Sequence, residues 1–92
     1  MGALPSRPPP CYIRAITPAE ADQRIIKSRQ ALHRYRAMVA AGQLPVMDMG
    51  LMNDELEWLE RIADRHPEKE AKIVKLGEDW LELMATIRAK LN

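Results

Sequence analysis

The positions of its prolines constrain the fold of this 92-residue chain more than any other feature. Four of the seven prolines lie within residues 1–10, where they exclude a helix because proline lacks a backbone N–H and clashes with the preceding turn. The other three, at positions 18, 45 and 67, fall where a helix would begin or has just ended. We therefore predict an extended, proline-rich N-terminal arm over 1–16 and a helical domain over 17–92.

The first helix is expected over 18–41. Thr17 and Glu20 have the capping-box spacing, in which each side chain accepts a hydrogen bond from the backbone N–H of the other residue. Gly42 follows the expected end, where glycine can adopt a positive φ. Apolar residues recur alternately every four and three positions, which predicts one buried stripe that only Ser28 interrupts: Ala21, Ile25, Leu32, Tyr35 and Val39.

Two further helices are expected over 49–65 and 67–90, separated by a proline that disfavours a helical conformation for the residue before it. The helix over 49–65 has an apolar arc of roughly 160°. That arc contains Leu51, Met52, Leu56, Trp58, Leu59, Ile62 and Ala63. No strand-rich region accompanies these helices, so the fold class is all-α, a small three-helix bundle.

The third helix is apolar over roughly 200° of its circumference, against the stripe of about 100° of a surface helix. One stripe contains Ile73, Leu76, Trp80, Leu83, Ile87 and Leu91, and a second contains Val74, Leu81 and Ala85. Gly77 lies between the stripes, where a missing side chain permits close backbone approach. Either this helix is sandwiched between the other two, or its second stripe packs against another chain. Small size and surplus apolar surface favour an oligomer formed through helix packing.

Composition and motifs argue against several classes of protein. The net charge of +1 creates no global field for nucleic acid or an anionic membrane. No apolar run approaches the roughly 20 residues that span a bilayer, and no secretory signal pattern opens the chain, so a cytoplasmic protein without membrane contact is expected. No metal-ligand spacing, nucleophile–base motif or glycine-rich phosphate loop is present. We therefore predict no enzymatic activity, no metal site and no cofactor.

Two charged residues fall within apolar arcs. Glu55 has two possible roles. It is a buried acid that pairs either with an arginine, such as Arg29 or Arg36, or with a basic residue of a partner. Alternatively, the helix starts late and Glu55 is an exposed acid in its first turn. Arg88 lies on the apolar flank of the third helix, where its long stem can cover apolar surface. Aromatic and arginine anchors dominate interface energies, although the two tryptophans suit the core equally well. The candidate partner-binding residues are Trp58, Trp80, Leu81, Arg88 and Glu55.

The leading prediction is a non-enzymatic, helical protein–protein interaction module, acting as an oligomeric adaptor or as an inhibitor of a larger protein machine. Its partner would be a protein, including a second copy of itself. The alternative is a small nucleic-acid-associated protein that uses the basic face of the first helix. The residues that would contact an anion or nucleic acid are Arg29, His33, Arg34 and Arg36. The acidic helix over 49–65 opposes this alternative because it would repel phosphates.

Overall fold

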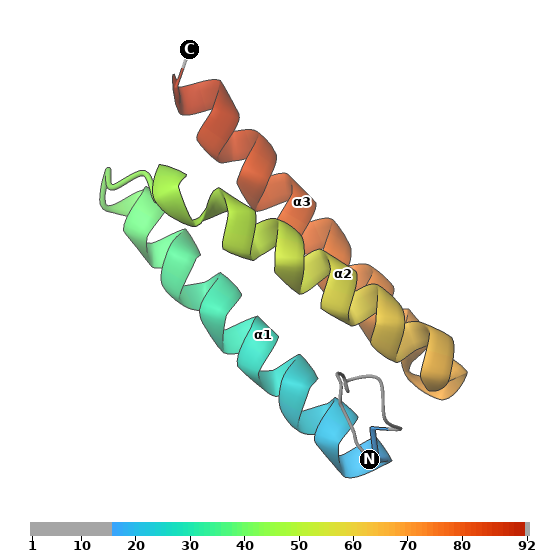
Figure 1. Ribbon diagram of the computed structural model, residues 1–92. Coiled ribbons are helices and arrows are strands. Elements are labelled where there is room, and N and C mark those ends of the chain that lie inside the picture. Colours follow the sequence, from blue (N-terminus) through green and yellow to red (C-terminus); the bar gives the residue numbers. More distant parts are fainter. Residues whose placement is uncertain (1–15, 92) are drawn as a thin grey trace, which may run out of the picture.

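The computed structural model describes residues 16–91, which fold into three helices, each antiparallel to the one before it (Figure 1). They are α1 (Pro18–Ala40), α2 (Met49–Arg65) and α3 (Glu70–Leu91), with the short 3₁₀ turns η2 (Val46–Asp48) and η3 (Pro67–Lys69) leading into the last two. No strand occurs within residues 16–91, so the all-α prediction is confirmed. The predicted arm lies outside the described residues except for Ile16.

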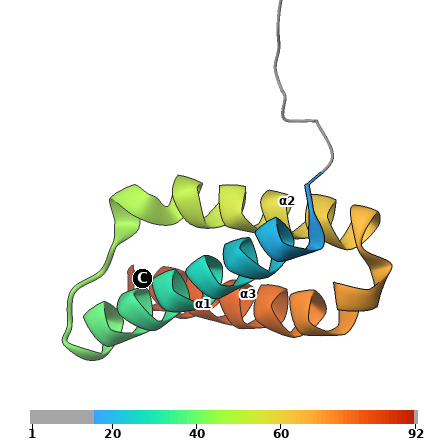
Figure 2. The same cartoon turned by 90° about the horizontal axis from the view of Figure 1, so that it is seen from below.

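The three helices form a triangular bundle. Figure 2 shows α2 on one side, with α1 and α3 on the other, and each helix contacts both of the others. In such a bundle every helix has two neighbours, which together cover a limited part of its circumference. The width of the apolar surface on each helix therefore decides how much of it remains exposed.

Local chemistry determines both ends of α1. The Thr17 hydroxyl accepts a hydrogen bond from the Glu20 N–H at 3.1 Å, and the Glu20 carboxylate accepts one from the Thr17 N–H at 2.9 Å. The capping box is thus confirmed. At the other end Gly42 has a φ of 86°, which L side chains rarely adopt, and the Gln43 N–H donates to the Met38 carbonyl at 2.9 Å.

The later helices begin through 3₁₀ turns. The Tyr35 hydroxyl donates to the Asp48 carboxylate at 2.9 Å, which fastens η2 to the side of α1. Pro67 opens η3, where its missing N–H costs no hydrogen bond, and α3 itself begins at Glu70 rather than at the expected position 67.

The junction of α2 and α3 is tied to the start of α1. The His66 Nε2 is hydrogen-bonded to the Ile16 carbonyl at 2.8 Å, and Ile16 packs against the core. Nearby, Lys69 Nζ donates to Asp22 Oδ1 at 2.8 Å although the Lys69 side chain is only 11% exposed. This hydrogen bond is the main reason why the pKa of Asp22 is lowered from its ordinary value of 3.8.

Trp80 of α3 is completely buried in the core of the bundle. Its indole Nε1 donates to the Ser28 hydroxyl at 2.9 Å, and its ring meets Tyr35 edge to face with centroids 5.9 Å apart. Ser28, which interrupts the apolar stripe of α1, therefore supplies the acceptor that a buried indole N–H requires. The remaining core residues are Ala21, Ile25, Leu32, Met52, Leu59, Ile62, Ile73, Leu76, Leu83, Met84 and Ile87.

Two leucines expected on the apolar arcs are not part of this core. Leu51 is 58% exposed and Leu91 is 51% exposed. They lie in the first turn of α2 and the last turn of α3, where neighbouring helices do not cover them.

Candidate interaction surfaces

A second stripe on α3 stays exposed in the folded chain. Val74 is 51% exposed and Leu81 is 56% exposed, and Ala85 is exposed as well. The first stripe of α3, by contrast, is buried from Ile73 to Ile87. The explanation in which α3 is sandwiched inside one chain is therefore wrong, because α1 and α2 use only one of its two apolar stripes. We call Val74, Gly77, Leu81 and Ala85 the outer strip.

Gly77 lies in the middle of the outer strip, at its border with α2. A Cβ atom added to Gly77 would lie 3.7 Å from Leu56 Cδ2, which is an ordinary van der Waals contact. The packing of α2 against α3 thus leaves room for alanine at this position. Glycine in a helix interior costs about 1 kcal/mol relative to alanine, and the contacts within the bundle do not explain that cost.

Opposite charges mark the two ends of the outer strip. Glu70 lies in the first turn of α3 and Arg88 in its last turn, and both are exposed. None of the ion pairs within residues 16–91 involves either of them. Arg88 therefore lies at one end of the outer strip, and its guanidinium has no ion-pair partner among residues 16–91.

A second surface lies between α1 and α2. A groove of about 330 Å³ is lined by residues of both helices, including Tyr35, Leu51 and half-buried Trp58. The Arg24 guanidinium lies over the Trp58 ring, 5.5 Å from its centroid. One face of Trp58 is therefore covered by a cation–π contact within the chain, which reduces the surface it can offer to a partner.

Glu55 belongs to the same groove and is a partly buried acid. Its Oε2 accepts a hydrogen bond from Arg24 at 2.6 Å, so its partner is Arg24 and not Arg29 or Arg36. Its Oε1 is buried without a hydrogen-bond partner among residues 16–91. The alternative of a late helix start is wrong, since α2 begins at Met49 and places Glu55 beyond its first turn.

Trp80 is 0% exposed, so the folded chain cannot present it to a partner. Its hydrogen bond to Ser28 and its contact with Tyr35 engage both the polar edge and the ring of the indole. Of the two roles that the sequence left open for this tryptophan, the structure places it in the core.

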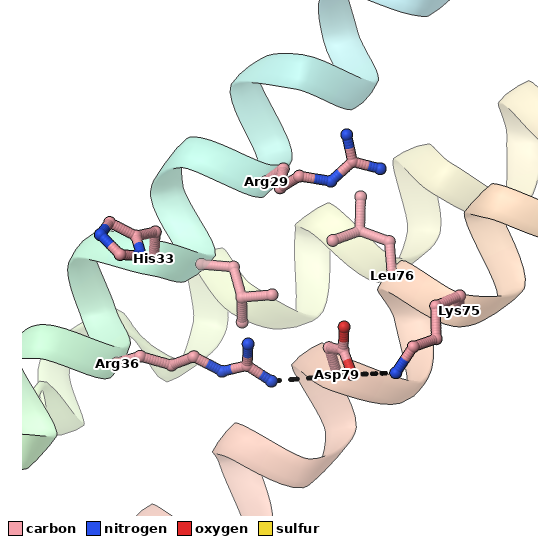
Figure 3. Close-up of a pocket in the computed structure, with 7 residues that line it drawn as sticks. Arg29, His33, Arg36, Lys75, Leu76 and Asp79 are labelled. Atoms are coloured by element: carbon pink, nitrogen blue, oxygen red, sulfur yellow. Dashed lines mark hydrogen bonds and ion pairs between the residues drawn. The ribbon is translucent and has the colours of Figure 1, made fainter.

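The basic residues of α1 border a third surface, a groove of about 190 Å³ between α1 and α3 (Figure 3). Arg29, His33 and Arg36 line one wall and Lys75 lies on the other. Asp79 accepts a hydrogen bond from Lys75 at 3.0 Å and forms an ion pair with Arg36 at 3.6 Å. This carboxylate offsets much of the positive charge that an anion would need.

The other predicted basic residue, Arg34, does not join this surface. It is exposed on α1 and is not among the residues that line the α1–α3 groove. The four basic residues expected to act together are thus divided between the groove and another part of the helix surface.

Several residues of these surfaces were missed in the sequence. Arg24 lies on the flank of α1 that faces Glu55, and Lys75 and Asp79 lie on the flank of α3 that faces α1. The signal for Glu70 was present, since it precedes Val74 by one helical turn and extends the second stripe toward the start of α3.

Residues 16–91 contain no cluster of three or more His, Cys, Asp or Glu side chains that could hold a metal ion. Within the same residues, no helix has the length and apolar character needed to cross a membrane.

Comparisons of the chain with protein-family models, with curated proteins and with solved structures found no match.

Proposed function

We propose that this protein is a non-enzymatic protein–protein interaction module that binds a partner helix along the outer strip of α3. The observation that carries the proposal is the half-exposure of Val74 and Leu81 on a helix whose other apolar stripe already forms the core. A larger apolar surface than the bundle can bury leaves hydrophobic area for a partner to cover.

The outer strip suits a helix better than an extended peptide. Val74, Gly77 and Leu81 are spaced by three and four residues, as in a coiled-coil stripe. The small residues Gly77 and Ala85 let a second helix approach closely. An extended peptide would add to an exposed sheet edge, and residues 16–91 contain no strand. In this proposal the protein is cytoplasmic and acts as an adaptor or an inhibitor. The three-helix bundle would hold the outer strip in a fixed position for its partner.

The test compares the tagged full chain with its Leu81→Glu variant as bait in an extract of the native host. The wild type should retain a protein, either untagged copies of itself or another chain, and Leu81→Glu should lose it because a carboxylate in an apolar interface is costly. Leu51→Glu is the matched control, since Leu51 is equally exposed, at 58% against 56%, but lies on another surface.

Both variants should keep the helicity of the wild type by circular dichroism, because exposed positions tolerate charge. Equal retention by wild type and Leu81→Glu, or no retention by either, would refute the proposed function.

The alternative, binding of a nucleic acid, has one observation in its favour. Lys75 of α3 joins Arg29, His33 and Arg36 of α1 around one groove. Binding to phosphates would weaken steeply between low and high salt, whereas a contact through the outer strip would change little. Arg29→Ala should reduce such binding and leave retention by the outer strip intact.

A further inference from the structure

The partner of the outer strip can be specified further, on the basis of the proposed function. Along α3, Glu70, Val74, Gly77, Leu81 and Arg88 lie at positions of an alternating spacing of four and three. Met84 holds the remaining position of that repeat but is only 4% exposed and belongs to the core, so exposed Ala85 beside it completes the outer strip. This alternating spacing is the repeat with which one helix packs along another in a coiled coil.

The chemistry of this repeat is arranged symmetrically about Asp79. Positions 70 and 88, and positions 77 and 81, are each equally distant from it in the sequence. When two copies of α3 lie antiparallel with their centres aligned, these positions face one another across the interface. Glu70 of each copy then faces Arg88 of the other, and Gly77 of each faces Leu81 of the other.

Charge selects this orientation. Glu70 and Arg88 are both exposed, and neither has an ion-pair partner within residues 16–91. An antiparallel copy pairs each carboxylate with a guanidinium at both ends of the strip. A parallel copy would place carboxylate against carboxylate and guanidinium against guanidinium, which is repulsive.

Shape selects the same arrangement. Leu81 is the most exposed large apolar residue of α3. Opposite it, the missing side chain of Gly77 leaves a notch in the surface of α3. Leu56 borders this notch but leaves enough room in it for a methyl group. In the antiparallel register each Leu81 enters the notch of the other copy, so a glycine that is unfavourable within the helix gains a packing role.

We infer that the outer strip is the interface of a homodimer in which two copies of α3 pack antiparallel, with Glu70 opposite Arg88 and Leu81 opposite Gly77. The arrangement is two-fold symmetric and closed, because both copies use the same surface. It therefore ends at a dimer and leaves no second outer strip for further growth.

The decisive experiment uses charge reversal in the full chain, followed by sedimentation equilibrium over a wide concentration range. The wild type should approach twice the mass of one chain. Glu70→Arg alone and Arg88→Glu alone should each dimerise about tenfold more weakly, because each places two like-charge contacts in the dimer. An equimolar mixture of these two variants should dimerise as the wild type does, since in the mixed pair each reversed residue faces an opposite charge.

A second variant tests the notch separately from the charges. Gly77→Ala should raise the stability of the folded chain to urea, because the new methyl meets Leu56 only at ordinary contact distance. It should nevertheless weaken dimerisation about tenfold, since the methyl occupies the space that Leu81 of the other copy needs. Gly50→Ala is the control, because a Cβ there meets nothing within 4 Å and no dimer contact involves it.

A chain that remains monomeric at every concentration would overturn the dimer, as would a mixture of charge-reversed variants that fails to recover wild-type association. Gly77→Ala that dimerises as tightly as wild type would overturn the register. The dimer and the proposed function can be refuted independently. If the chain is monomeric but wild type still retains another protein that Leu81→Glu loses, only the dimer is refuted. If the chain is monomeric and retains no protein, both are refuted.

Discussion

Replacing Ser28 by alanine should destabilise this protein more than the loss of one hydroxyl from a helix would suggest. The Ser28 hydroxyl accepts the hydrogen bond of the Trp80 indole at 2.9 Å, and both residues are 0% exposed. In the variant the indole N–H stays buried, and neither water nor another side chain can reach it without rearrangement of the core.

The magnitude follows from two opposing effects. Leaving a buried N–H without an acceptor costs about 1–3 kcal/mol. Alanine is the better helix former, which returns up to about 0.5 kcal/mol. We therefore expect a net loss of about 1–2.5 kcal/mol, which for a domain of this size lowers Tm by roughly 5–15 °C.

The assay is urea unfolding of the full chain followed by far-ultraviolet circular dichroism, with thermal melts as a second measure. Thr86→Ala is the matched control, since it removes a hydroxyl that donates to the Glu82 carbonyl at 3.0 Å on the exposed side of α3. The control should change the free energy of unfolding by less than about 0.5 kcal/mol. A Ser28→Ala variant as stable as the control would show that the indole does not depend on this acceptor.

Three further predictions concern the caps and ion pairs. Thr17→Ala removes the cap of α1 and should cost about 0.5–2 kcal/mol of unfolding free energy in urea, and an unchanged midpoint would contradict the cap. Arg24→Met leaves the partly buried Glu55 carboxylate unpaired, so it should lower Tm more than the double variant Arg24→Met/Glu55→Leu does; equal losses would contradict this. The folded-state pKa of Asp22 is lowered by its hydrogen bond with Lys69, so its stabilising effect is complete above the unfolded pKa and is lost as pH falls through the folded pKa. Stability measured below about pH 4 should therefore fall more steeply with pH for wild type than for Asp22→Asn, and parallel slopes would refute the linkage.

Local features of the sequence were sufficient to locate the helices. Thr17, Glu20 and Gly42 act on the backbone within a few residues of themselves, so their effect does not depend on the rest of the fold. Pro67 acts in the same way through its missing N–H. The width of the apolar surface on α3 was likewise visible, because the angular position of each side chain follows from the 3.6-residue turn.

What only the tertiary structure decided is the position of each helix along its neighbours. Angular position shows which way Glu55 points, but the axial offset between α1 and α2 determines that Arg24 meets it, and not Arg29 or Arg36. The same offset between α1 and α3 brings Ser28 to the indole of Trp80. These offsets result from the interlocking of many core side chains, which no local pattern specifies. The sequence showed two apolar stripes on α3. Which of these stripes the other helices cover depends on the same packing, so only the folded bundle showed that the stripe with Val74 and Leu81 stays exposed.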